Sequence, residues 1–294
     1  MEIIKLKQNT PEWERWRSDS LSLGASDAPA IWGVDKYTSP KMLFDEKLYG
    51  RIASGRKHLN DYLVEKARAF EARGHAMSGL ETDREYERGV CAEHSTHRFI
   101  KASFDGLNLD IQRFWENKYV GVDNYMAMKN SPKSIHVTAA KKVPAASLLR
   151  RYLPQLCQQS FVSGFLECDF TVYNDQEDDT QTMEITFDAD YVNRVMEKVF
   201  AFRELLVSKT PPPLTDLDTL ELADAFSIEA FTHLMDAHHR KDKGHEKQIR
   251  ECIIGMLPHS KVSCMGVKVT RTKDGKHVFK FPHEQQSQIQ QENP

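Results

Sequence analysis

The 294-residue sequence lacks the features that mark membrane proteins, secreted proteins and zinc ribbons. No apolar run approaches the roughly 20 residues that a membrane-spanning helix needs, and the first residues contain no apolar segment typical of a secretory signal. The five cysteines are scattered and never form a C-x-x-C pair, which argues against a disulfide framework. No repeat of solenoid length is present. We therefore expect a cytoplasmic protein without membrane contact, built from one large domain or two ordinary ones.

A net charge of either sign is nearly absent, since 40 lysines and arginines stand against 43 acidic residues and give −3, but the charges are concentrated locally. Residues 113–151 contain eight basic and two acidic side chains, and residues 51–73 contain six and three. Residues 168–193 contain eight acidic side chains and no lysine or arginine. Ordinary solvated surfaces would explain such blocks. Opposed basic and acidic surfaces are also typical of proteins that bind polyanions.

The first two thirds of the chain mix helical and strand-like segments. Capping residues and apolar spacing predict helices over 10–18, 26–32, 40–48, 57–73, 145–164 and 188–208. Short alternating segments predict strands over 85–91, 98–103, 107–111 and 114–120, with an Asp105-Gly106 turn before the third. A further β-pair is predicted over 169–173 and 182–187.

A triproline segment at 211–213 divides the chain. We expect a core domain over 1–210 and an extension over 211–284 that packs on this core. In the extension, residues 216–257 are predicted to be helical and strongly charged, and residues 261–281 to form a hairpin around Asp274-Gly275. The Gln-rich tail over 285–294 is predicted to be disordered.

Two carboxylates and a lysine form the candidate catalytic group. Glu116 and Lys118 are alternate residues of a predicted strand, so their side chains share a face. Asp105 lies at the predicted turn beside the preceding strand. If the two elements pair, both carboxylates can reach one hard cation such as Mg²⁺, and Lys118 can orient or deprotonate a water. This arrangement suits metal-assisted phosphodiester hydrolysis, but a hairpin turn followed by a salt-bridged strand would give the same pattern.

The order of several motifs resembles a known family. These motifs are Gln8-Asn9-Thr10-Pro11-Glu12-Trp13, Trp16-Arg17, Gly24-Ala25-Ser26-Asp27-Ala28, Ser39-Pro40, Ser103-Phe104-Asp105-Gly106-Leu107, Glu116-Asn117-Lys118 and Tyr152-Leu153-Pro154-Gln155-Leu156-Cys157. In this order and spacing they resemble the YqaJ-like viral recombinase family, which includes the phage lambda-type alkaline exonucleases. The resemblance covers roughly residues 8–208.

This resemblance implies a PD-(D/E)xK nuclease of α/β class. Its restriction-endonuclease-like core has a mixed central sheet flanked by helices, followed by a charged helix and a hairpin. It also implies an enzyme that digests one strand of linear double-stranded DNA from the 5′ end and leaves a 3′ overhang. Mg²⁺ is the implied cofactor, with Mn²⁺ as a substitute. The implied partners are further copies of the chain in a homotrimeric ring and a single-strand DNA annealing protein.

The resemblance assigns the catalytic residues one by one. Asp105, Glu116 and Lys118 match the catalytic motif, and the carbonyl of Asn117 matches a further metal ligand. An acidic residue on the preceding helix is also implied. Glu65 is our first choice for it, and Glu71 is the second.

A binding pocket for the DNA 5′-phosphate is implied as well. Arg17, Ser26, Ser103 and Gln155 match its positions, and a guanidinium beside the first turn of a helix suits a phosphate. The chain departs from the family pattern at three positions, where it has Ser95, Phe104 and Cys157. Because Cys157 replaces a second glutamine, we expect one contact of this pocket to be missing.

Other functions stay open at this point. A structure-specific or nicking endonuclease could use the same core, and so could a DNA-end-binding protein without catalytic activity. Cys91, His94 and His97 could suggest zinc ligands, but without a fourth ligand at standard spacing an ordinary surface turn is the better interpretation.

Overall fold

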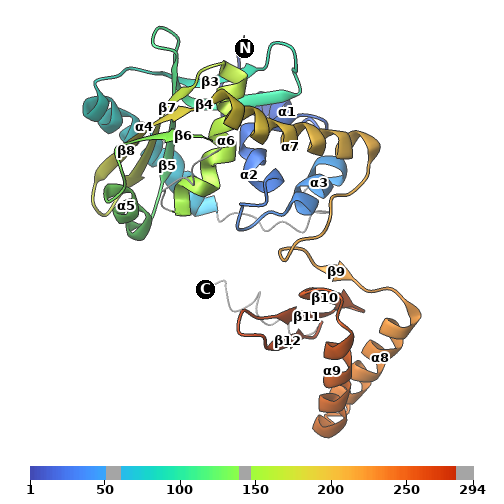
Figure 1. Ribbon diagram of the computed structural model, residues 1–294. Coiled ribbons are helices and arrows are strands. Elements are labelled where there is room, and N and C mark those ends of the chain that lie inside the picture. The colour runs from blue at the N-terminus through green and yellow to red at the C-terminus, as the bar shows by residue number, and fades with distance from the viewer. Residues whose placement is uncertain (51–60, 139–146, 283–294) are drawn as a thin grey trace. The chain divides into compact units, whose positions relative to one another are not determined.

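The computed structural model describes residues 1–50, 61–138 and 147–282. The chain divides into two compact units, Met1–Pro213 and Leu214–Pro294 (Figure 1). The tail over 285–294, predicted to be disordered, lies outside the described residues. In the described parts of the chain, no helix has both the length and the apolar character to cross a membrane.

One mixed sheet forms the centre of the first unit. Its strands are β1 (Glu2–Ile4), β2 (Leu23–Gly24), β3 (Glu87–Glu93), β4 (Ile100–Asn108), β5 (Arg113–Tyr119), β6 (Ser134–Val137), β7 (Glu167–Asn174) and β8 (Asp179–Phe187). Their order is β1-β3-β4-β5-β7-β8-β6, and β2 pairs with β4. The β2–β4, β5–β7 and β6–β8 pairs are parallel, whereas the remaining pairs are antiparallel. The predicted α/β class with a mixed central sheet is confirmed.

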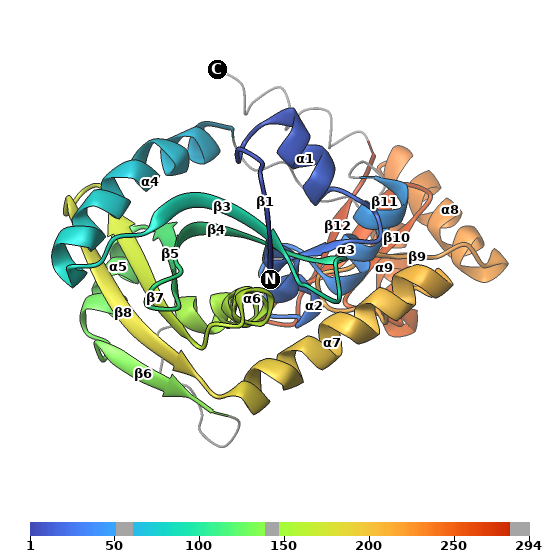
Figure 2. The same ribbon diagram turned by 90° about the horizontal axis from the view of Figure 1, so that it is seen from above.

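Helices cover both faces of this sheet. They are α1 (Pro11–Arg17), the short 3-10 helix η1 (Ala25–Asp27), α2 (Ala28–Ile31), α3 (Pro40–Tyr49), α4 (Asp61–Thr82), α5 (Val122–Lys129), α6 (Ser147–Ser163) and α7 (Ala189–Ser208). Gly74 of α4 lies so close to β5 that a Cβ there would be 2.9 Å from the Nδ2 of Asn117. The adjacent residue of β5, Glu116, points to the opposite face and bonds to α6. Thus α4 and α6 lie on opposite faces of the sheet (Figure 2).

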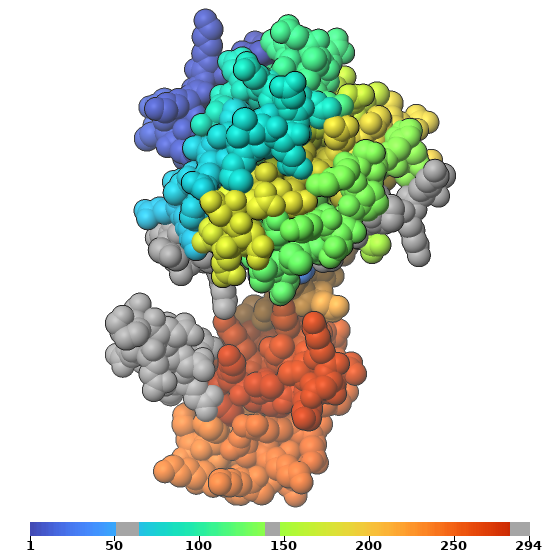
Figure 3. Space-filling model, turned by 90° about the vertical axis from the view of Figure 1, so that its left-hand side faces the viewer, coloured from blue at the N-terminus to red at the C-terminus, as the bar shows by residue number. Residues whose placement is uncertain are grey.

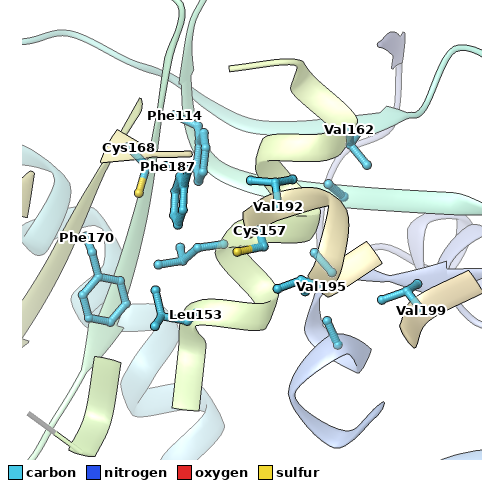
Figure 4. Close-up of a cluster of buried hydrophobic side chains, with 14 of the residues drawn as sticks. Phe114, Leu153, Cys157, Val162, Cys168, Phe170, Phe187, Val192, Val195 and Val199 are labelled. Carbon is cyan, nitrogen blue, oxygen red and sulfur yellow. The ribbon is translucent and has the colours of Figure 1, made fainter. Parts of the chain in front are cut away.

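The main hydrophobic core lies between the sheet and the helices α6 and α7. Phe114 and Phe170 from the sheet are fully buried, and Leu153 and Cys157 of α6 face them (Figure 4). Val192, Val195 and Val199 of α7 close the cluster from the other side of α6. Burying one large apolar side chain stabilises a fold by about 1.5–3 kcal/mol. This cluster therefore holds α6 firmly against the strands that carry the candidate catalytic residues.

The predicted turn at Asp105-Gly106 is wrong, because both residues lie inside β4. The chain reverses only after Asn108, whose Oδ1 accepts hydrogen bonds from the amides of Asp110 and Ile111. Accordingly, the strand predicted over 107–111 does not form. Gly106 is explained by packing instead, since a Cβ at this position would lie 2.7 Å from the Cβ of Tyr86.

Other elements of the first unit differ in length or were not predicted. Helix α4 continues to Thr82, nine residues beyond the predicted end at 73. Its predicted first residues, 57–60, lie outside the described residues. β1, α5 and β6 were missed, because segments of three, eight and four residues are too short for periodicity to detect. The caps are as predicted at Thr10 and Ser39, whose side chains accept hydrogen bonds from the amides of Trp13 and Met42.

The second unit contains two helices and a separate sheet. Its elements are β9 (Leu220–Glu221), α8 (Ala225–His239), α9 (Lys243–Met256), β10 (Lys261–Cys264), β11 (Val267–Arg271) and β12 (His277–Lys280), and the sheet order is β12-β11-β10-β9. One face of this sheet forms a small core with α8 and α9, which includes Phe231, Ile253 and Val269.

Two predictions for the second unit are wrong in the same way. The continuous helix over 216–257 is instead β9, α8 and α9, with a reversal at Lys241 (φ 57°) before the N-cap Asp242. The first part of the predicted hairpin, residues 261–269, forms two strands rather than one, because Met265 and Gly266 both have positive φ and join β10 to β11. The predicted hairpin around Asp274-Gly275 is present as β11–β12.

Candidate active site

The candidate site lies where the sheet opens along one edge of β4. On that edge, β2 pairs with the first residues of β4, and β5 pairs only from Gly106 onward. Residues 102–105 therefore have no strand beside them on this edge. A side-chain amide takes the place of the missing strand, because buried carbonyl groups need hydrogen-bond donors. Gln159 Nε2 of α6 donates to the carbonyl of Ser103 (3.1 Å) on this edge, and Gln8 Nε2 donates separately to that of Phe104 (3.0 Å).

A cavity of about 260 Å³ opens beside this gap. It brings together most of the site residues predicted from the sequence. The predicted residues that line it are Arg17, Ser26, Ser103, Asp105, Glu116, Lys118 and Gln155. Trp13, Trp16, Arg68, Glu71 and Lys101 are among the other lining residues.

Glu116 is buried and held in place by several donors. Lys118 Nζ and Gln155 Nε2 donate to its Oε1, the latter at 2.6 Å. Gln159 Nε2 donates to its Oε2, also at 2.6 Å. A carboxylate with donors on both oxygens cannot rotate freely, so the two amides of α6 fix the direction in which Glu116 can offer its remaining lone pairs.

Asp105 has fewer donors and more negative neighbours. Its Oδ2 accepts one hydrogen bond, from the backbone amide of Asn117 at 2.8 Å. Desolvation by the surrounding protein, together with the negative charges of Glu116 and Glu71, raises the pKa of Asp105 well above its ordinary value. Although burial lowers the pKa of Lys118, the charges of Glu116 and Asp105 outweigh it and raise that pKa above its ordinary value. The negative charges next to Asp105 thus outweigh the effect of Lys118 on its pKa.

The structure does not bring Glu65 to the cavity, whereas Glu71 lines it. Glu65 is exposed on α4. Six positions on a helix correspond to a rotation of about 240°, so the two residues cannot share one face. The second choice made from the sequence is therefore the one that lies beside Asp105 and Glu116.

The expected role of the Asn117 carbonyl as a metal ligand stays a prediction, and other groups of this residue make the described contacts. Its amide holds Asp105, and its side chain lies against Gly74 on the α4 face. Asn117 is not among the residues that line the cavity.

The carboxylates are the right kind of donor for a hard divalent cation. Mg²⁺ takes oxygen ligands, commonly one or two carboxylates with the remaining positions filled by water. In the described part of the chain, no three His, Cys, Asp or Glu side chains are grouped closely enough to form a complete protein-only metal site. Cys91, His94 and His97 are among the described residues that form no such group. The His94 ring instead stacks on the Phe161 ring, with the two centroids 4.4 Å apart. Asp105 and Glu116, with Glu71 nearby, fit a cation that keeps part of its water shell.

Arg17 and two hydroxyl groups adjoin the carboxylates in the same cavity. Arg17 Nη2 donates to Ser26 Oγ at 2.7 Å, and its guanidinium lies over the Trp13 ring, 4.9 Å from the centroid. Trp13 Nε1 donates to Ser103 Oγ at 3.0 Å. No carboxylate lies within ion-pair distance of Arg17 among the residues described. A guanidinium without an ion pair beside two hydroxyl groups is suited to a phosphate.

The expected loss of a phosphate contact at Cys157 stays a prediction. Cys157 faces the core of Figure 4 and is fully buried. The second amide at Glu116 comes from Gln159, which lies four residues after Gln155 and so on the same face of α6. Sequence reasoning missed Gln159 and the link through Trp13. The i, i+4 spacing of the two glutamines was the available signal.

Comparison with known proteins supports the fold. No family model matches the chain, and no curated protein matches it. Among solved structures, the alkaline exonuclease LHK-Exo from Laribacter hongkongensis has a TM-score of 0.51 and 20% sequence identity, and the match covers 67% of this chain and 93% of that chain. A structure of LHK-Exo in complex with dAMP matches equally well. A phage-related exonuclease from Haemophilus somnus has 10% identity and a TM-score of 0.46, which is too low to establish a shared fold. This chain thus shares its fold with LHK-Exo, and the restriction-endonuclease-like α/β fold predicted from the sequence is confirmed.

Proposed function

We propose that the protein is a metal-dependent deoxyribonuclease that digests one strand of linear double-stranded DNA from the 5′ end. The observation that carries this proposal is the content of one cavity. Asp105, Glu116 and Lys118 line it together with the Arg17–Ser26 pair. A phosphate-binding corner beside a carboxylate–lysine group suits an enzyme that holds a terminal phosphate while it cleaves the adjoining strand.

The residues of the chain have separate parts in this reaction. Asp105 and Glu116 would hold Mg²⁺, with Mn²⁺ as a substitute, and Glu71 is placed to assist them. When bound, the cation supplies Lewis-acid polarisation of the phosphoryl oxygen and lowers the pKa of water. Lys118 lies where its ammonium group can orient a water and offset charge on the phosphoryl oxygens. Gln155 and Gln159 keep Glu116 in position throughout.

Digestion of end-labelled linear duplex tests the proposal. With Mg²⁺ we expect release of nucleotides from the 5′-labelled end and persistence of the 3′-labelled strand, and excess chelator should stop the reaction. Lys118→Ala and Glu116→Gln should each lower the rate by at least about 100-fold while folding is kept. Lys129 is exposed on α5 and does not line the cavity, so Lys129→Ala is the matched control and should cleave normally.

Three results would contradict the proposal. They are cleavage by Lys118→Ala near the wild-type rate, full activity in excess chelator, and release from the 3′ end first. Cutting of closed circular DNA would identify an endonuclease on this fold instead. Duplex binding without any cleavage would identify a DNA-end-binding protein.

We extend the proposal to the assembly and the partner. A homotrimeric ring would place three such cavities around one duplex, and the 3′ overhang is the strand on which an annealing protein assembles. Sedimentation of the full chain, with and without duplex, tests the trimer. Co-purification with a single-strand annealing protein tests the partner.

A further inference from the structure

The β11–β12 hairpin of the second unit concentrates positive charge on its surface. Between residues 267 and 280 it has five basic side chains and one acidic side chain. The basic residues are Lys268, Arg271, Lys273, Lys276 and Lys280, and all of them are exposed. In the described part of the chain, the one ion pair of the hairpin joins Lys276 to Asp274 at 3.3 Å.

Strand register brings two of these lysines together on one face. Lys268 and Lys280 are direct partners across the strands, so they extend from the same face of the sheet. Their neighbours Val269 and Phe279 point to the opposite face and pack in the small core. Like charges directly opposite each other destabilise a sheet. A surface that keeps such a pair without an acidic partner is suited to an external anion.

The first segment of the unit has the opposite charge. Residues 214–236, which include most of α8, contain six acidic side chains and no lysine or arginine. Phe231 and Leu234 of α8 pack on the inner face of the sheet, away from Lys268 and Lys280. On the outer face, Glu221 of β9 lies at the other edge, separated from Lys268 by Ser263 of β10. Strands β10–β12 reach the surface on the face that Figure 3 shows.

The chemistry of the outer face indicates which polyanion fits it. Single-stranded nucleic acid is usually bound by aromatic rings on which bases stack. The outward residues of the hairpin strands are Lys268, Thr270, Val278 and Lys280, and the hairpin's phenylalanine is buried. Without a stacking surface, contacts are limited to phosphates, whose spacing is regular in a duplex. A two-stranded ribbon also has a width that a duplex groove admits.

We propose that the β11–β12 hairpin is a second DNA-binding site, which holds the phosphate backbone of double-stranded DNA independently of the cleavage site. This inference rests on the proposed function for its choice of DNA over other polyanions. It gives the second unit a role in retaining the duplex substrate. Binding should be independent of base sequence and strongly dependent on salt.

Fluorescence anisotropy of the full chain with a labelled blunt duplex, in chelator, tests the site without cleavage. Lys268→Gln/Lys280→Gln is compared with Lys243→Gln/Lys247→Gln, two exposed lysines of α9 that give the same change in net charge. We expect the hairpin variant to lose affinity by on the order of tenfold per lysine at 0.1 M salt, and the salt slope to fall by about 1.8. The α9 variant should bind within about twofold of the wild type, and the Lys→Arg hairpin variant should keep its affinity.

Equal losses in the two glutamine variants would overturn the proposal, because net charge alone would then explain them. So would unchanged duplex affinity in the hairpin variant. A larger loss for single-stranded than for double-stranded DNA would assign the surface to single strands instead. Turnover at saturating duplex should be unchanged in the hairpin variant. Hairpin-dependent binding by a wild type that does not cleave would refute the nuclease and leave this site standing.

Discussion

Two carboxylates on the same sheet differ in the groups that contact them. Asp169 of β7 is fully buried and accepts hydrogen bonds from Arg84 (2.9 Å), Arg113 (2.7 Å) and the Tyr86 hydroxyl (2.6 Å). Asp105 of β4 accepts one hydrogen bond, from the amide of Asn117, and has Glu116 as a charged neighbour. Asp169 is therefore in direct contact with two guanidinium groups, whereas the one hydrogen bond described for Asp105 comes from a neutral amide.

This difference distinguishes a structural ion cluster from a candidate catalytic one. A buried charge that is fully paired contributes to the native structure, and removal of one partner is costly. Carboxylates crowded together without enough cations destabilise the fold, and proteins keep such groups where function requires them. The missing positive charge at Asp105 is what a divalent cation would supply.

The largest effect is expected at the paired cluster. Asp169→Ala leaves the Arg113 and Arg84 guanidinium groups without their shared carboxylate, and it should lower the free energy of unfolding by about 3–5 kcal/mol. Urea denaturation followed by circular dichroism measures this. Glu184→Ala removes an exposed partner of Arg84 and should cost below about 1 kcal/mol. Similar losses in the free energy of unfolding for the two variants would show that burial of Asp169 does not strengthen its ion pairs.

The opposite result is expected at the unpaired cluster. Asp105→Asn removes one of the crowded negative charges, so in chelator the variant should be at least as stable as the wild type. Mg²⁺ at 100 times its Kd should stabilise the wild type by about 2.7 kcal/mol and the variant much less. Thermal unfolding with and without Mg²⁺ gives both quantities. A clear loss of stability for Asp105→Asn in chelator would make Asp105 a structural residue like Asp169.

Arg17 sharpens the comparison, because it is a cation without a carboxylate partner among the described residues. If Arg17 binds a 5′-phosphate, Arg17→Ala should lower the preference for 5′-phosphate over 5′-hydroxyl ends roughly tenfold. A loss of this size corresponds to the free energy that one charge-assisted hydrogen bond contributes. Basal cleavage should change less. Competing digestion of the two substrates measures the ratio, and Arg15→Ala, on an exposed part of the same helix, is the control. A preference that survives in Arg17→Ala would place the phosphate elsewhere.

The smallest effect concerns pH. Burial raises the pKa of Asp27, but Lys47 at 2.9 Å and the Gly24 amide outweigh it and lower that pKa below its ordinary value. The stability that Asp27 contributes is therefore present above its unfolded pKa, about 3.9, and is lost as pH falls through the lower folded value. Urea denaturation at pH 7 and pH 3 should show a smaller difference in Asp27→Asn than in the wild type. An unchanged difference would exclude Asp27 as a source of acid sensitivity.

The sequence by itself determined the local relations within single elements. Alternation along β5 predicts that Glu116 and Lys118 share a face, and the lysine indeed donates to that glutamate. The caps at Thr10 and Ser39 and the Asp274-Gly275 hairpin depend on neighbouring residues only, and they too were predicted. These features are local because their hydrogen bonds join residues close in the chain.

Only the tertiary structure decided which elements meet at the site. The Asp105-Gly106 pair suggests a turn locally, but packing of Gly106 against Tyr86 keeps it within a strand. The choice of Glu71 over Glu65 depends on how α4 is rotated against β5, and that rotation is set by the close approach at Gly74. The gap beside β4, where the cavity opens, exists because β2 and β5 each pair with only part of that strand. Such pairings join residues far apart in the chain, and their free energy depends on the packing of the whole unit, which no local pattern contains.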